Sequence, residues 1–259
     1  MRLVMMTAVG LLAATSAAGQ TLDQAKVVAD GRAAQYSLQR QGFGGVTCTL
    51  TPDWETTLGQ SRSDPGMTGA FEIFDQLKFT TWVDAEGAAA VDGVDAGAPR
   101  QGDAAAGIEQ IFQGADDAVR GVFFTWSMFM VNSPFPPSGA AATVTPQAGG
   151  YRVAYKEGDA DVTVHLERNL TISRVEVRAP AYRATIEPVF RPSSKGLVLT
   201  RYVADYVPTA GPGVTHLTVG VDYQSVSGMQ IPSMIDVSST LDGEPSKLRA
   251  FFSGCRMAK

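Results

Sequence analysis

Residues 151–178 read YRVAYKEGDADVTVHLERNLTISRVEVR. Over most of this stretch apolar side chains recur at every second position, which is the period of a β-strand with one buried face. Two polar turns, Glu157-Gly158-Asp159 and Arg168-Asn169, interrupt the alternation. Its phase slips near Ser173, as a β-bulge allows. The stretch therefore predicts three antiparallel strands joined by tight turns.

The same pattern continues to the C-terminus. About eight consecutive strands with short connections predict an antiparallel meander that is strongly curved or closed. The connections are rich in the turn-forming residues Gly, Pro, Asp and Ser. After the strands of residues 151–178, strands are expected over 182–187, 197–206, 214–223, 229–238 and 247–255.

Upstream of this region the patterns are mixed. Residues 21–38 have helical spacing behind a capping box that begins at Thr21, and residues 46–51 alternate like a half-buried strand. Residues 88–107 predict a weak strand and then a loop. No repeat or long linker divides the chain, so we predict one β-rich domain over residues 20–259. Its class is α+β, with a curved antiparallel sheet covered by two to three helices.

The strongest helix signal spans residues 108–131. Its apolar side chains lie at steps of three and four, and residues 122–131 are apolar on nearly every side. One interpretation is a helix buried between the sheet and another element. The other is that the end of the helix lines an apolar ligand cavity against the sheet. The candidate ligand-binding residues are Phe123, Trp126, Phe129 and Met130.

The N-terminus has the parts of a bacterial-type export signal. Met1-Arg2 supplies a positive charge, residues 3–14 are apolar, and small residues follow. The apolar run is shorter than the roughly 20 residues that a membrane-spanning helix needs. We therefore predict a signal peptide over residues 1–19, cleaved near Ala18-Gly19-Gln20. The mature protein is expected to be periplasmic or secreted, without a transmembrane segment.

Two cysteines, Cys48 and Cys255, lie near opposite ends of the predicted domain. In an oxidising compartment they predict one disulfide, and two free thiols are the alternative. A structural zinc site needs about four ligands, so two cysteines are too few for one. No CxxC pair is present, so the predicted role of the disulfide is structural.

Charge and motifs exclude several classes of function. The net charge is −5 and becomes −6 once Arg2 leaves with the signal peptide, and no Lys/Arg cluster predicts a nucleic-acid partner. His165 and His216 fall on the polar faces of strands without metal-ligand spacing. Motifs of serine hydrolases, metalloproteases and nucleotide-binding proteins are absent. We predict no catalytic residue, no metal and no cofactor.

Residues 223–235 read YQSVSGMQIPSMI. A strand that ends in Tyr223 is followed by a turn at Gly228 and by the pair Ile231-Pro232. This hairpin resembles one in the periplasmic lipoprotein-carrier family and its mycobacterial glycolipid-binding relatives. The resemblance implies a half-barrel of antiparallel strands wrapped around helices, with an apolar cavity for acyl chains.

Together these observations predict a non-enzymatic exported protein that binds an apolar lipid or an acyl chain, and its partner would be a lipid or an acylated protein. Two alternatives remain. One is a fully packed structural or interaction domain that binds no small ligand. The other is a hydrolase-type enzyme whose carboxylates converge only in three dimensions.

Overall fold

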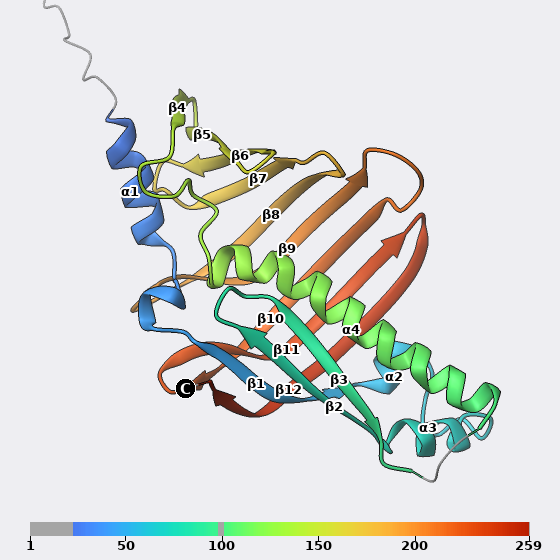
Figure 1. The fold of residues 1–259 in the computed structure, drawn as a ribbon. Coiled ribbons are helices and arrows are strands. Elements are labelled where there is room, and N and C mark those ends of the chain that lie inside the picture. The colour runs from blue at the N-terminus through green and yellow to red at the C-terminus, as the bar shows by residue number, and fades with distance from the viewer. Residues whose placement is uncertain (1–22, 98–100, 259) are drawn as a thin grey trace, which may run out of the picture.

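The computed structural model describes residues 23–97 and 101–258. Within them the chain forms one antiparallel sheet of twelve strands, four α-helices and a 3₁₀ turn at Gln39–Gln41 (Figure 1). The predicted signal peptide and the Thr21 cap lie outside the described residues. The helices are α1 (Gln24–Ala34), α2 (Trp54–Leu58), α3 (Thr68–Phe74) and α4 (Asp103–Met130). The strands are β1 (Gly45–Pro52), β2 (Leu77–Asp84), β3 (Ala89–Asp95), β4 (Ala142–Gln147), β5 (Gly150–Glu157), β6 (Ala160–Glu167), β7 (Ile172–Arg178), β8 (Tyr182–Ser193), β9 (Gly196–Pro208), β10 (Thr215–Val226), β11 (Met229–Leu241) and β12 (Glu244–Met257).

The sheet is a curved meander with two free edges, so the predicted α+β class is confirmed and the sheet does not close. Strands β4 to β12 are neighbours in chain order, and β1 then pairs with β12 and carries β2 and β3 beyond it. The bulge expected near Ser173 is present, because Leu166 pairs with Ile172 while His165 pairs with Arg174. Ser173 is therefore left without a partner in the ladder.

The hairpin that carries the family resemblance is β10–β11. Its turn residues Ser227 and Gly228 have φ angles of 50° and 80°, the left-handed conformation that a two-residue hairpin turn requires. Pro232 pairs with Tyr223 beside an irregularity in the register. A proline is tolerated inside the sheet at such a point, because the ladder there does not need its missing N–H.

Helix α4 crosses the concave face of the sheet diagonally (Figure 1). On one flank the backbone N–H of Val91 in β3 donates to the Asp116 carboxylate, at 2.7 Å. On the other flank the Tyr202 hydroxyl of β9 donates to the Val122 carbonyl, at 3.1 Å. Helix α4 is therefore hydrogen-bonded on one side to the β2–β3 hairpin and on the other side to β9 in the middle of the sheet.

Two helix boundaries differ from the expectation. Helix α4 begins at Asp103, because the alanines at 104–106, which were expected to form a loop, are strong helix formers. Helix α1 ends at Ala34 instead of continuing to residue 38. Here a long-range contact replaces the helical pattern, since the Tyr36 N–H donates to the Leu197 carbonyl of β9 at 3.0 Å. None of the described helices is long and apolar enough to cross a membrane.

The predicted disulfide is confirmed and joins neighbouring strands. Cys48 of β1 and Cys255 of β12 are bonded, with Cα atoms 4.1 Å apart. The strand register shifts at this point, so that Gly254 and Cys255 lie opposite Cys48. The bond fastens the last strand to the first strand of the sheet in chain order.

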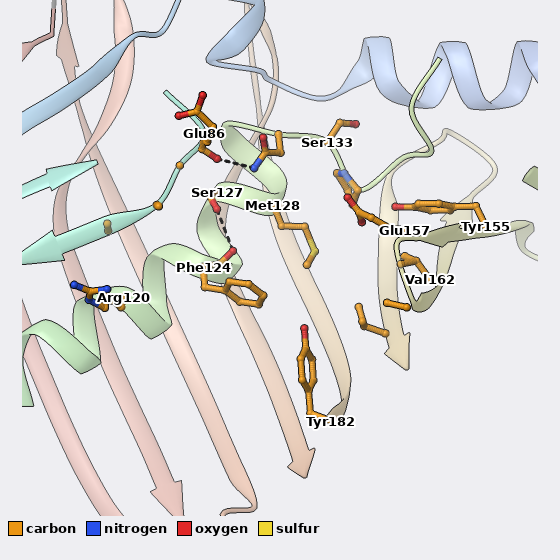
Figure 2. Close-up of a pocket in the computed structure, with 17 residues that line it drawn as sticks. Glu86, Arg120, Phe124, Ser127, Met128, Ser133, Tyr155, Glu157, Val162 and Tyr182 are labelled. Atoms are coloured by element: carbon orange, nitrogen blue, oxygen red, sulfur yellow. Dashed lines mark hydrogen bonds between the residues drawn. The ribbon is translucent and has the colours of Figure 1, made fainter. Parts of the chain in front are cut away.

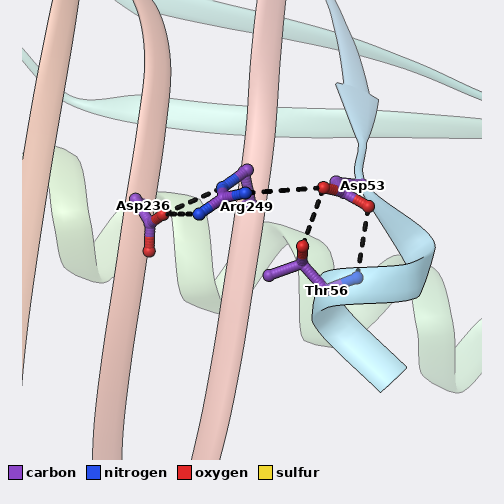
Figure 3. Close-up of polar contacts among 4 residues, drawn as sticks. All are labelled: Asp53, Thr56, Asp236 and Arg249. Atoms are coloured by element: carbon purple, nitrogen blue, oxygen red, sulfur yellow. Dashed lines mark hydrogen bonds and ion pairs between the residues drawn. The ribbon is translucent and has the colours of Figure 1, made fainter. Parts of the chain in front are cut away.

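Helix α2 is attached to the outer side of β12 by a polar network (Figure 3). Asp53 caps the helix, and its carboxylate accepts from the Thr56 amide at 3.2 Å and from the Thr56 hydroxyl at 2.8 Å. The Asp53 amide donates to the Arg249 carbonyl of β12. The Arg249 guanidinium lies 3.9 Å from the Asp53 carboxylate and also donates to Asp236 of β11. The network links the short helix to two strands.

Removing the disulfide should destabilise the fold. We expect the Cys48→Ala/Cys255→Ala variant to lose about 2–5 kcal/mol of unfolding free energy, because the bond joins residues separated by 207 positions and restricts the unfolded chain. Urea unfolding of the variant, and of the wild type with and without reductant, measures the loss. Reduced wild type should match the variant, and identical midpoints for oxidised and reduced protein would contradict the prediction.

Removing the Asp53 cap should have a pH-dependent effect. The hydrogen bond from the Thr56 hydroxyl, with help from the Thr56 amide and the Arg249 charge, holds the pKa of Asp53 below its usual value. A lowered folded-state pKa stabilises the fold above the unfolded-state pKa, and this stabilisation is lost as the pH falls through the folded-state value. Asp53→Ala should therefore cost about 1 kcal/mol at pH 7 and less at pH 3, measured by urea unfolding. Asp92→Ala, which removes an exposed carboxylate of β3, is the control. If Asp53→Ala lowered the free energy of unfolding equally at pH 7 and pH 3, the proposed pH dependence would be wrong.

Candidate functional site

A groove of about 590 Å³ lies beside the C-terminal half of α4 (Figure 2). One wall is the face of α4 that carries Phe124 and Met128, and the opposite wall is formed by strands β5 to β8. The turn between β2 and β3 and residues 132–134 complete it. We call this space the α4 groove.

The walls of the α4 groove are mainly apolar. Phe124 is 53 % exposed and lies beside other apolar groups of the groove, so that together they form an exposed apolar patch. Phe124 and Met128 lie one helical turn apart on the same side of α4 and point toward Tyr182 and Val162 (Figure 2). Val177 completes the apolar wall on the sheet side. The groove thus presents an open apolar surface from two directions.

Polar groups lie along the rim and are mostly engaged. The Asn132 side chain donates to the Glu86 carbonyl at 2.9 Å, and the Ser127 hydroxyl donates to the Phe124 carbonyl at 3.1 Å. The Arg120 guanidinium is paired with Asp116 of its own helix, at 2.6 Å. These contacts fix the rim instead of leaving it free for chemistry.

Two tyrosines contribute neutral hydroxyl groups to the groove. Burial, together with the nearby charge of Glu157, raises the pKa of Tyr155 well above its usual value. Burial and the same carboxylate also raise the pKa of Tyr182. Both phenols therefore stay protonated at neutral pH, so the apolar wall gains hydrogen-bond donors but no charge.

The predicted ligand-binding residues lie on the other side of α4. Phe123 and Trp126 are buried, and their ring centroids are 5.1 Å apart. Phe123 also packs edge-on against Phe252 of β12. The indole N–H of Trp126 donates to the Tyr223 hydroxyl at 3.0 Å, which satisfies a polar group that burial would otherwise leave without a partner.

Phe129 and Met130 are equally buried. Phe129 packs edge-on against Phe190 of β8, and the Met130 sulfur accepts from the Leu199 N–H at 3.4 Å. The structure thus brings all four predicted side chains into the core between α4 and the sheet, and none of them lines the α4 groove. A role for these four in ligand binding stays a prediction.

The sequence analysis missed the residues that do line the groove. Phe124 and Met128 belong to the stretch 122–131 that is apolar on nearly every side, which was the available signal. Helical spacing put Phe123 on the apolar stripe and Phe124 off it, and the cavity was expected on the side of the stripe. Val162 and Val177 of the far wall belong to the apolar faces of the predicted strands, but alternation does not tell what covers those faces.

Metal-binding and titratable clusters are scarce. Among residues 23–97 and 101–258 no group of three or more His, Cys, Asp or Glu side chains could hold a metal ion. His165 lies 3.4 Å from Glu176, and His216 lies 2.6 Å from Asp205. Each histidine thus has one carboxylate neighbour, and neither lines the α4 groove.

The two faces of α4 should respond differently to truncation. Trp126→Ala should lower the free energy of unfolding by about 3–5 kcal/mol, because it opens a cavity in the core and leaves the Tyr223 hydroxyl without its partner. Phe124→Ala should change it by less than about 1 kcal/mol, because that ring is half exposed. Urea unfolding of both variants measures the contrast. Similar losses of unfolding free energy in the two variants would mean that α4 does not have one buried face and one half-exposed face.

Comparison with known proteins adds no function to this geometry. No protein-family model matches the chain, and no curated protein or solved structure matches it. The resemblance of residues 223–235 to the lipoprotein-carrier family therefore stays a prediction. The residues of the α4 groove are therefore the basis for a proposed function.

Proposed function

We propose that the protein is an exported, non-enzymatic carrier that binds an apolar lipid or an acyl chain in the α4 groove. The observation that carries the proposal is the half-exposed Phe124, which faces an apolar wall across a space of about 590 Å³. Ligand pockets in proteins typically measure about 300–1,000 Å³ and have mainly apolar linings. The groove falls within this range.

The energetics favour an apolar occupant. Each methylene group removed from water contributes about 0.8 kcal/mol, so a long acyl chain, with about ten or more buried carbons, gains an amount comparable with the roughly 4–15 kcal/mol that association costs. Phe124 would also lose exposed apolar surface when covered. Met128 adds an adaptable side chain that fits irregular apolar partners.

The rim supports carriage over catalysis. A nucleophilic serine needs a general base within hydrogen-bond reach, and the Ser127 hydroxyl instead donates to a carbonyl of its own helix. The Cys48–Cys255 disulfide supports export, because such bonds persist mainly in oxidising compartments. Together with the predicted signal peptide, it favours a periplasmic or secreted carrier.

The alternative of a fully packed interaction domain has one supporting observation. The four residues expected to line a cavity, Phe123, Trp126, Phe129 and Met130, are packed in the core. The two functions make different predictions for Phe124, because only a carrier uses its ring to bind a small apolar ligand.

Changing Phe124 should weaken binding without affecting the fold. We expect Phe124→Ser to reduce the affinity for 1-N-phenylnaphthylamine, an uncharged apolar fluorophore, by roughly tenfold, because half a phenyl ring no longer becomes buried on binding. Fluorescence titration measures the affinity. Phe251→Ser, which changes a phenylalanine of β12 that is 43 % exposed, is the matched control and should bind as the wild type does.

Native mass spectrometry of protein purified from the periplasm of an expressing host gives a second readout. A stoichiometric lipid that is lost in Phe124→Ser would support the carrier. Failure of the wild type to take up the fluorophore or any lipid from added vesicles would favour the packed interaction domain.

A further inference from the structure

A second pocket of about 360 Å³, lined mostly by polar residues, lies next to the α4 groove. It lies where α1 ends, and we call it the α1 pocket. Asn132, Ser133 and Glu157 line both spaces, so these residues lie between the groove and the pocket. Ser133 and Glu157 are visible at the end of the groove nearest to α1 (Figure 2). The α1 pocket is also lined by Arg32, Gln35 and Arg40.

The amide of Gln35 is the unusual group in the α1 pocket. Gln35 is only 3 % exposed, and neither its Nε2 nor its Oε1 has a hydrogen-bond partner within the described parts of the chain. Buried polar groups are nearly always paired, so an unpaired amide calls for an explanation. The Ser133 hydroxyl oxygen is also buried without a partner. Two residues that line this pocket, from separate segments, thus each carry an unpaired polar group that is buried at its wall.

Two arginines give the pocket a positive charge. Arg32 donates to the Ser138 hydroxyl at 3.1 Å and to the Pro136 carbonyl. Arg40 donates to the Arg32 carbonyl at 3.1 Å and to the Gln35 carbonyl. These bonds hold the side chains in place, and a guanidinium has five N–H groups, so donors remain. Glu157 is the one acidic residue of the lining, which leaves an excess of positive charge.

We propose that the α1 pocket binds the anionic head group, a carboxylate or a phosphate, of an amphiphile whose acyl chain lies in the α4 groove. The Gln35 amide N–H and the Ser133 hydroxyl donate to the anion, and Arg32 and Arg40 neutralise its charge. This inference rests on the proposed function and adds the ligand's chemical class. The apolar groove and the basic pocket share Ser133 and Glu157 in their linings, and side by side they match the two parts of one molecule.

The test compares hexadecanoate, hexadecyl phosphate and the uncharged hexadecanol, each titrated into the full mature protein at pH 8 in low salt. We expect at least one of the two anions to bind tenfold or more tightly than hexadecanol. Raising the salt concentration should weaken binding of that anion and leave hexadecanol unchanged. The preferred anion then identifies the head group, and inorganic phosphate tests whether the pocket binds free anions without a chain.

Gln35→Met is the decisive variant, because it keeps the shape of the side chain and removes its amide. It should abolish the advantage of the anion over hexadecanol while the hexadecanol affinity stays the same. It should not lower the thermal midpoint, because it removes an unpaired buried group. Thr57→Val is the matched control, since Thr57 of α2 also has a buried hydroxyl without a partner, and it should leave both affinities unchanged.

Arg40→Gln gives an independent readout. Its side chain is exposed, and its loss should weaken anion binding several-fold and flatten the salt dependence. Arg62→Gln, which changes another exposed arginine, is the control for charge.

The outcomes separate the two proposals. Equal affinities for the anions and hexadecanol, unaffected by Gln35→Met, would overturn the head-group inference and leave the carrier intact. Inorganic phosphate that binds as tightly as hexadecyl phosphate would also overturn it, because the chain would then contribute nothing. Absence of binding by hexadecanol and by 1-N-phenylnaphthylamine would instead overturn the proposed function.

Discussion

The antiparallel pairing of β1 with β12 is the interaction on which the rest of the structure depends. It brings a hairpin from the first part of the chain to the last strand, and the Cys48–Cys255 bond fastens the two strands covalently. Only because of this pairing does β3 reach the flank of α4, where the Val91 amide meets Asp116. A sheet built from β4 to β12 alone would leave that side of the helix in water. The long-range pairing therefore decides how much of α4 is buried and which side remains for a groove.

Helix α4 has more apolar surface than the sheet can cover. A helix that is apolar all round has to be buried on all sides, whereas a single curved sheet encloses it only partly. Trp126 and its neighbours occupy the concave face and are hydrogen-bonded or packed there. Phe124 and Met128 lie on the remaining side, where strands β5 to β8 curve away and leave the groove. The apolar site is thus the uncovered side of the same helix that forms the core.

The sequence predicted those features that depend on neighbouring residues. Strict alternation placed the strands of residues 151–178, and the phase slip located the bulge at Ser173. Features that depend on distant contacts were missed or wrong. Helix α1 stops at Ala34 because Tyr36 pairs with Leu197, more than a hundred residues away along the chain. Helical spacing identified the buried face of α4, which carries Phe123, and a ligand-binding role for that residue stays a prediction. How far the opposite face, with Phe124, is covered depends on where distant strands pack, which a local pattern does not contain.

The polar end of the site follows from backbone contacts in the same way. The Tyr36 N–H donates to the Leu197 carbonyl and the Leu38 N–H donates to the Met130 carbonyl at 2.8 Å, so the segment after α1 is held on both sides. Gln35 is therefore placed by the backbone around it and not by bonds of its own amide. The stability of the sheet offsets the cost of leaving this amide unpaired. In the head-group proposal the anion would supply the partner that the fold does not, and the backbone held beside Gln35 would reduce the freedom lost on binding.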